Sequence, residues 1–287
     1  MFVIIGYVLV VGSVLGGFAM AGGHLHVLFQ PVELIIIAGA ATGSLVVGNT
    51  PKVLKAIGKA LGSCFKNTAV TKAFYMSLMA LMFEVLTKVR KEGLMSIESD
   101  VEEPEQSTIF QKYPEVLADH HIVEFLTDYL RLMVSGNLNP MEIENLMDGE
   151  LETHHQEAHV PAASVQTIAD GLPAFGIVAA VMGVVHVMGS VGQVSNAELG
   201  NMIAAALVGT FLGILLSYGF IGPLASLLNH KTNESSKPFE CVKTTLLASL
   251  NGYSPALAVE FGRKVLYSTE RPSFIELEEH VKSTKGK

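Results

Sequence analysis

The sequence carries little charge for its length. Only 16% of its 287 residues are Asp, Glu, Lys or Arg, and the mean hydropathy is +0.43, whereas soluble domains usually carry about 25% charged residues. Charge is absent from four long stretches, which are residues 1–32, 34–51, 171–197 and 199–230. This distribution excludes an ordinary soluble enzyme and indicates a membrane protein. The net charge of -8 argues against a nucleic-acid partner.

The sequence also lacks the motifs of common enzyme classes. It has no G-x-S-x-G, no P-loop, no G-x-G-x-x-G after a strand and no H-E-x-x-H. We therefore expect neither enzymatic activity nor a cofactor. The two cysteines, Cys64 and Cys241, form no C-x-x-C pattern, so we expect free thiols in a reducing compartment.

Histidines gather at one place without completing a metal site. His155 and His159 are four residues apart and share one helical face, with His154 and Glu157 beside them. A third ligand on that face is not evident. We favour a surface histidine cluster over a bound metal.

Four segments are apolar and long enough to be membrane helices, since a helix needs about 20 residues to cross the hydrocarbon core. They are residues 2–20, 34–47, 172–191 and 202–228. A signal peptide is the alternative for the first segment, because Ala19-Met20-Ala21 resembles a cleavage site. The missing basic n-region and the length of the apolar stretch favour a retained helix.

Basic residues give the orientation of these helices. All 19 Lys and Arg lie in residues 52–131 and 231–287, after the second and fourth spans, and basic residues close to a span favour the cytoplasmic side. We therefore expect both termini and the middle segment in the cytoplasm. The expected fold class is all-α, a polytopic membrane protein with four transmembrane helices and a helical cytoplasmic domain. Its expected parts are residues 1–50 and 171–229 in the membrane, and residues 51–170 and 230–287 in the cytoplasm.

The middle segment has the periodicity of amphipathic helices. Apolar residues three and four apart predict a helix over residues 68–92 that Gly93 ends. A second helix is predicted over residues 120–134, with Gly136 after it. Both helices bury one apolar face, which favours a compact helical domain.

A third helix of this segment has a clear start. Asn139, Pro140 and Glu142 supply an N-cap, a first-turn proline and an acidic third position. We expect this helix to run toward Pro161 and into the third span.

Small residues recur at four-residue spacing in three of the spans. The pairs are Gly12 and Gly16, Gly39 and Gly43, and Gly209 and Gly213. In lipid, such faces let helix backbones approach closely. Packing within the chain explains any single pair, but several pairs together favour contacts with further helices, and hence an oligomer.

The membrane part lacks a carboxylate at mid-membrane, where ion-translocating proteins normally have an ionisable group. Glu33 begins the second span just after Pro31, and we expect it at the membrane interface rather than as an ion carrier. His186 is the only ionisable group deep in a span, and we favour a neutral packing role for it over a proton relay. An ion pathway here would need an acid supplied by a partner.

Two prolines stand near the inner ends of the third and fourth spans. Pro173 is explained most simply as the first-turn proline of its helix, where the missing N–H costs little. Pro223 lies within an apolar helix and is expected to make a kink or a local break, which is a plausible hinge.

Charge in the middle segment is arranged in blocks. Basic residues at positions 88–91 are followed by acidic residues at positions 92–105. The pattern alone favours a solvated helix end. A docking surface for a partner of mixed charge is the alternative.

Several longer runs resemble one family, the MotA family of flagellar motor stator subunits. They are residues 206–215 (ALVGTFLGIL) with Pro223 after them, residues 172–186 (LPAFGIVAAVMGVVH), residues 259–264 (VEFGRK) and residues 270–280 (ERPSFIELEEH). The similarity covers nearly the whole chain.

The resemblance implies partners and a mechanism that the residues alone do not give. Subunits of this family are taken to form a pentamer in the bacterial inner membrane around two MotB subunits, which supply the proton-carrying carboxylate. Ion flow is thought to turn this ring against the rotor protein FliG. By position, Arg90 and Glu98 match the family's charged pair for rotor contact, which reverses the interpretation as a solvated helix end. Pro173 and Pro223 match its two coupling prolines.

The resemblance also bears on the ion. Sodium-driven relatives are similar but carry Thr where this chain has Ala180, and that hydroxyl could join Thr210 in coordinating a cation. Without it an oxygen ligand for Na⁺ is missing. We therefore predict proton coupling.

Three other functions would require different features in the sequence. A TolQ or ExbB type of proton-channel subunit, which energises outer-membrane processes, would have three membrane helices rather than four. A four-span transporter should show polar substrate-binding residues at mid-membrane or repeat symmetry, and we find neither. A purely structural scaffold is the third.

Overall fold

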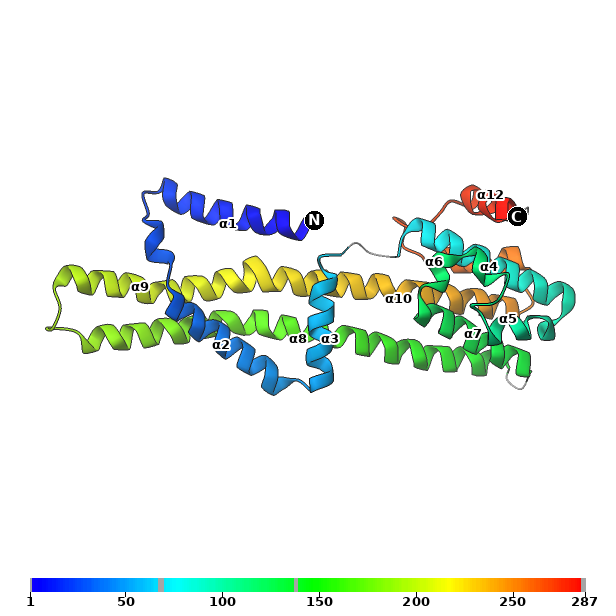
Figure 1. Ribbon diagram of the computed structural model, residues 1–287, viewed down its shortest axis with the longest axis horizontal. Coiled ribbons are helices and arrows are strands. Elements are labelled where there is room, and N and C mark those ends of the chain that lie inside the picture. The colour runs from blue at the N-terminus through cyan, green and yellow to red at the C-terminus, as the bar shows by residue number, and fades with distance from the viewer. Residues whose placement is uncertain (1, 67–69, 137–138, 285–287) are drawn as a thin grey trace. The chain divides into compact units, whose positions relative to one another are not determined.

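The computed structural model describes residues 2–66, 70–136 and 139–284, and every regular element in these ranges is helical (Figure 1). The expected all-α class is confirmed. The chain forms two compact units. Unit 1 consists of Met1–Asn67 and Ala158–Lys231, and unit 2 consists of Thr68–Glu157 and Thr232–Lys287. Our boundaries at 50, 170 and 229 followed charge rather than packing, and they stay a prediction.

Unit 1 contains the apolar helices. Its elements are α1 (Phe2–Met20), the 3-10 turn η1 (Leu25–Leu28), α2 (Pro31–Gly48), α3 (Pro51–Ser63), α9 (Asn196–Ile214), the π-helical segment η4 (Leu215–Ile221), and parts of α8 (Pro140–Gly189) and α10 (Gly222–Leu250). Four stretches are long and apolar enough to cross a membrane, which confirms the four expected spans. They lie in Phe2–Met20, Leu25–Gly48, Pro140–Gly189 and Asn196–Leu250.

The third span is part of a longer helix. The apolar segment covers only residues 172–191, whereas α8 is a continuous helix of 50 residues from Pro140 to Gly189, which confirms that the helix opened at Asn139 runs past Pro161 into the third span. It begins as predicted, because Asn139 and Glu142 form a reciprocal capping box: Asn139 Oδ1 accepts from the Glu142 N–H at 3.0 Å, and Glu142 Oε2 accepts from the Asn139 N–H at 2.9 Å. Pro161 and Pro173 both lie inside it.

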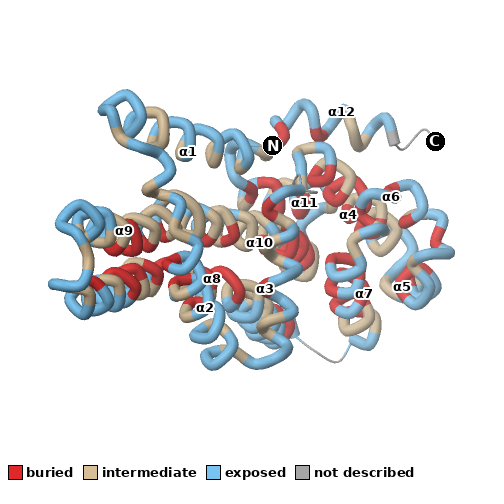
Figure 2. Tube along the Cα trace, turned by 60° about the vertical axis from the view of Figure 1, so that its left-hand side comes forward, coloured by how far each residue is buried: buried red, intermediate tan, exposed pale blue. Residues whose placement is uncertain are grey.

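Helices α8 and α9 run side by side in opposite directions, and their facing sides are buried (Figures 1 and 2). Their backbones touch at glycines. A Cβ atom added at Gly213 would lie 2.7 Å from Gly176 Cα, and one added at Gly176 would lie 2.8 Å from the Gly209 carbonyl oxygen. The pair Gly209 and Gly213 is therefore used for packing within the chain.

The other two glycine pairs are not used within the chain. A Cβ atom at Gly12, Gly16, Gly39 or Gly43 would meet no described atom within 4 Å. Helix α1 has no buried residue at all. These faces remain available for helices of other subunits, as expected of an oligomer.

A lysine closes the end of α3. The Lys231 ammonium donates to the carbonyl oxygen of Ser63, the last residue of α3, at 2.6 Å and to that of Lys66, beyond the helix, at 2.7 Å. Cys64 is a buried free thiol at the same end, and burial raises its pKa. A thiol in such surroundings is inert.

Unit 2 has the main hydrophobic core. Its elements are α4 (Lys72–Glu92), η2 (Leu94–Ile97), α5 (Glu98–Glu102), η3 (Phe110–Lys112), α6 (Pro114–Leu117), α7 (His120–Ser135), α11 (Pro255–Lys264), α12 (Phe274–Thr284), and parts of α8 and α10. Buried side chains of α4 and α7 join others from α10 and α11 in one cluster (Figure 2).

The two predicted helices of this unit are confirmed. Helix α4 begins after the N-cap Thr71 and ends at Gly93, whose φ of +85° favours glycine. Thr68, where we expected its start, lies outside the described residues. Helix α7 starts at His120 as predicted and ends at Gly136, whose φ is +67°.

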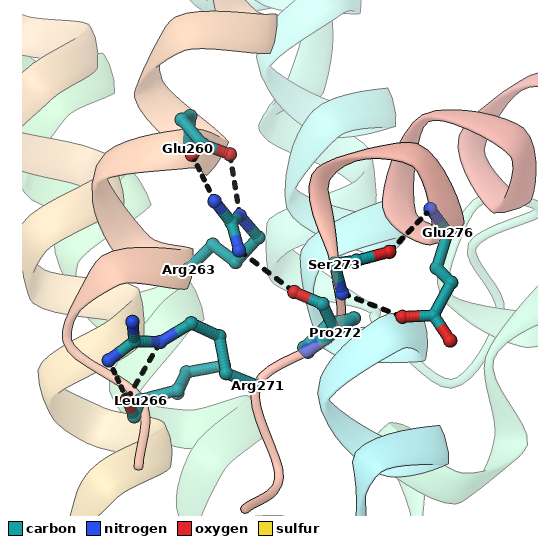
Figure 3. Close-up of polar contacts among 7 residues, drawn as sticks. All are labelled: Glu260, Arg263, Leu266, Arg271, Pro272, Ser273 and Glu276. Atoms are coloured by element: carbon teal, nitrogen blue, oxygen red, sulfur yellow. Dashed lines mark hydrogen bonds and ion pairs between the residues drawn. The ribbon is translucent and has the colours of Figure 1, made fainter. Parts of the chain in front are cut away.

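The last segment is tied together by polar contacts (Figure 3). The buried Arg263 guanidinium donates two hydrogen bonds to the Glu260 carboxylate and a third, of 2.8 Å, to the Pro272 carbonyl oxygen. These donors hold the pKa of Glu260 below its usual range, so its stabilising charge is lost only as the pH falls through that lowered pKa. Ser273 and Glu276 then form a capping box that starts α12.

Replacing Arg263 should loosen this segment. Arg263→Met leaves the Glu260 carboxylate and the Pro272 carbonyl without their donor, and breaking such a buried pair typically costs about 3 kcal/mol. We expect a lower melting temperature for the purified protein in detergent, followed by circular dichroism. Lys264→Met changes the exposed neighbouring residue and is the matched control. Equal melting temperatures for the two variants would show that Arg263 contributes nothing.

Candidate functional site

The two prolines both lie in unit 1, and Ser217, six residues before Pro223, bonds to α8 one turn before Pro173. In an α-helix the N–H of Pro173 would pair with the carbonyl of Ala169, and proline has no N–H. The Ser217 hydroxyl donates to that carbonyl oxygen at 2.6 Å and is 1% exposed. Because Pro173 is inside α8, the simpler alternative of a first-turn proline is wrong.

The break expected at Pro223 takes the form of a π-helix. Helix α9 passes into η4 before α10 begins, and Pro223 is the second residue of α10. Within η4, Tyr7 of α1 donates its hydroxyl hydrogen to the Phe220 carbonyl oxygen at 3.1 Å, and the two rings lie 4.8 Å apart. Such π-helical turns are frequent at functional sites.

Ser217 therefore connects the π-helical segment before Pro223 to the part of α8 just before Pro173. It belongs to η4, which precedes Pro223, and its hydrogen bond reaches the carbonyl that Pro173 leaves unpaired. If η4 moves along α8, this hydrogen bond must either break or pull the Ala169 carbonyl with it. The arrangement can pass a movement from one helix to the other.

The two expected ion-pathway positions lie on the facing helices α8 and α9. Ala180 is buried against α9, where a Cβ atom at Gly209 would lie 3.0 Å from its backbone nitrogen. Thr210 follows Gly209 and is half-buried. The structure brings the two positions to the same level of the helix pair.

Glu33 of α2 is buried against α8 and α9, with a side chain that is 9% exposed. Its place at the membrane interface stays a prediction. His186, for which we favoured packing, is exposed on this chain. The burial of Glu33 could not be predicted from the sequence, because it depends on glycines of other helices that lie far along the chain.

The two candidate rotor-contact residues flank η2 in unit 2. Arg90 is exposed in the last turn of α4, and its Nη1 donates to the Tyr253 carbonyl oxygen at 3.2 Å. Glu98 is the exposed first residue of α5 and lines a surface pocket with Met95 and Arg131. Both side chains are open to solvent at one connection.

Their neighbours in the charged block have a structural role. Lys88 Nζ forms an ion pair of 2.7 Å with Asp100, and the Ser107 hydroxyl donates to the other Asp100 oxygen at 2.6 Å. Asp100 is buried. This brace fixes α5 relative to α4, so Glu98 is presented from a rigid element.

The histidine cluster does not converge on one point. The His154 ring packs 4.7 Å from the Phe239 ring, whereas His159 Nδ1 lies 3.2 Å from Asn229 Oδ1. Within the described ranges, no three His, Cys, Asp or Glu side chains are placed to hold a metal ion.

The sequence matches two family models. Residues 4–93 match the family described as Motility protein A N-terminal, and residues 117–241 match the MotA/TolQ/ExbB proton channel family. Motility protein A of Escherichia coli is 57% identical over 286 residues, covering 100% of this chain and 97% of that protein. Motility protein A of Salmonella typhimurium is 55% identical, with the same coverage.

A solved structure shares the fold. The chain is similar to one in the structure of C. jejuni MotAB, with a TM-score of 0.77 and 21% sequence identity. The match covers 94% of this chain and 98% of that one.

Removal of the Ser217 hydroxyl should destabilise unit 1. Ser217→Ala leaves the buried Ala169 carbonyl without a donor, which costs about 1–3 kcal/mol. We expect a lower melting temperature in detergent and faster amide exchange around Pro173. Ser13→Ala, which removes an exposed hydroxyl bonded within its own helix, should change neither. If both variants behave like the parent protein, the bond to Ala169 is energetically irrelevant.

Proposed function

The chain belongs to the motility protein A family and is a subunit of a flagellar stator, and from that premise we propose how it works. Together with MotB it forms a proton-conducting unit whose movement drives the rotor protein FliG. The observation that carries the proposal is the full-length similarity to motility protein A. The N-terminal family match favours this function over a TolQ or ExbB type of subunit.

MotB supplies the missing acid in this proposal. Each elementary charge that moves down the membrane potential releases about 2.3 kcal/mol per 100 mV. We propose that five copies of the chain surround two MotB subunits, with the unused glycine faces of α1 and α2 in contact with neighbours. The unit lies in the bacterial inner membrane with both termini in the cytoplasm, as the positions of Lys and Arg favour.

The prolines couple ion flow to movement. Protonation of the partner carboxylate changes the charge beside α8 and α9 near Ala180 and Thr210. Helix η4 then moves relative to α8, and the Ser217 bond transmits this to the carbonyl freed by Pro173. Helices α8 and α10 each contain residues of both units, so the chain links this site to unit 2 through them.

Arg90 and Glu98 make the contact with the rotor. Exposed charges of both signs steer an encounter and select its register. The two residues flank η2, and the Lys88–Asp100 ion pair holds this connection in place. Force on FliG is therefore not lost through movement of a loop. Charge complementarity rather than apolar burial suits a contact that must be made and released repeatedly.

Substitution of the proposed coupling residues should abolish or weaken motility. In a strain lacking the native gene, we expect Arg90→Ala, Glu98→Ala and Pro173→Ala each to reduce swimming in soft agar. Arg90→Glu should be worse than Arg90→Ala, because facing like charges cost several kcal/mol. Lys91→Ala, at an exposed site next to Arg90, is the control and should swim normally. Normal swimming in all three alanine variants would remove the rotor-contact and coupling roles.

The driving ion should be the proton. Ala180 offers no side-chain oxygen, whereas Na⁺ requires oxygen ligands. Rotation of tethered cells should stop when an uncoupler collapses the proton gradient and continue when potassium replaces sodium. Sodium-dependent rotation that persists in the presence of the uncoupler would contradict proton coupling.

A further inference from the structure

Glu33 occupies a notch formed by two glycines. A Cβ atom at Gly209 of α9 would lie 2.9 Å from Glu33 Oε2, and one at Gly183 of α8 would lie 3.4 Å from Oε1. Any larger residue at Gly209 would take the place of the carboxyl group. The two glycines therefore make room for this side chain between three helices, and it is 9% exposed.

One oxygen of the carboxyl group has no hydrogen-bond partner among the described residues. Oε2 is fully buried and makes no hydrogen bond to any described residue. A buried carboxylate without partners is costly in an apolar setting, whereas the neutral acid costs much less. The first turn of α2, in which Glu33 lies, has unpaired N–H groups that favour the anion. Burial favours the neutral acid and the N–H groups favour the anion, so both forms of the Glu33 carboxyl group are accessible.

The parts of the neighbouring elements that belong to the membrane helices carry few other ionisable groups. The turn η1 and the residue before it carry His26 and His24, α8 carries His186, and α9 carries Glu198. None of them donates a hydrogen bond to the Glu33 carboxyl group within the described ranges. The chemistry of the notch thus centres on one acid.

We propose that the Glu33 carboxyl group is a proton-binding site of this chain, on the ion pathway and additional to the carboxylate of the partner. A proton from the outer aqueous phase forms the O–H bond at Oε2, and the same bond breaks when the proton passes to water further along the path. Gly209 contacts both this carboxyl group and Ala180, which places the site next to the proposed ion-pathway positions. The inference rests on the proposed function.

A glutamine at position 33 separates this role from packing. Glutamine has the shape of the neutral acid and fills the notch, but it cannot bind and release a proton. If Glu33 only packs, Glu33→Gln should therefore behave like the parent chain. If it transfers protons, Glu33→Gln should fail while Glu33→Asp keeps part of the activity.

The first test measures rotation at low load, where proton transfer limits speed. We expect Glu33→Gln to slow it by about 10²-fold, the lower end of what a positioned acid-base group contributes, and Glu33→Asp to recover part of that loss. Glu198→Gln, at an exposed acid in α9, should rotate normally. Membrane levels and copurification with MotB establish that each variant assembles. Normal rotation of Glu33→Gln, or equal loss in Glu33→Gln and Glu33→Asp, would overturn the inference.

A second test does not depend on the motor. The infrared spectrum of the purified complex with MotB should show a carbonyl band of a protonated carboxylic acid that titrates with pH and is missing in Glu33→Gln. Identical spectra for the two proteins would also overturn the inference. Failure of the parent chain to drive rotation would instead overturn the proposed function, while the spectra still decide the question of Glu33.

Discussion

Hydrocarbon offers no hydrogen-bond partner, so a proline inside a membrane helix creates a carbonyl that the protein itself must satisfy. In this chain Pro173 creates that need at Ala169, and Ser217 meets it from the neighbouring helix. The helices approach closely there, because α8 and α9 touch at Gly176 and Gly213. The same close approach at Gly209 brings the proposed ion-pathway positions together.

Much of the fold could be predicted because its causes are local. Apolar length identified the four spans, and caps such as Asn139 and Gly136 gave helix ends to within a residue or two. The run of α8 into the third span was predicted, but the donor to the carbonyl that Pro173 leaves unpaired was not, because Ser217 lies 48 residues away from Ala169. Local rules on proline favour a helix start at that point, and a tertiary hydrogen bond overrides them.

The positions of the candidate site residues could be predicted from the sequence, but their burial and contacts could not. The resemblance placed Arg90 and Glu98 in one charged block, but composition does not distinguish them from Lys88 and Asp100. The structure does, because the second pair is an internal brace and the first pair is exposed. The burial of Glu33 could not be predicted for a related reason, since the glycines next to it lie in other helices.

The glycines of this chain fall into two groups with different duties. Gly176, Gly209 and Gly213 are filled by contacts within the subunit, whereas Gly12, Gly16, Gly39 and Gly43 face no described atom. In the proposed assembly, tertiary structure and subunit contacts are therefore encoded at separate positions of the same sequence. Substitutions in the second group would then change how subunits meet one another, even the number of neighbours, while the contact between α8 and α9 stays intact.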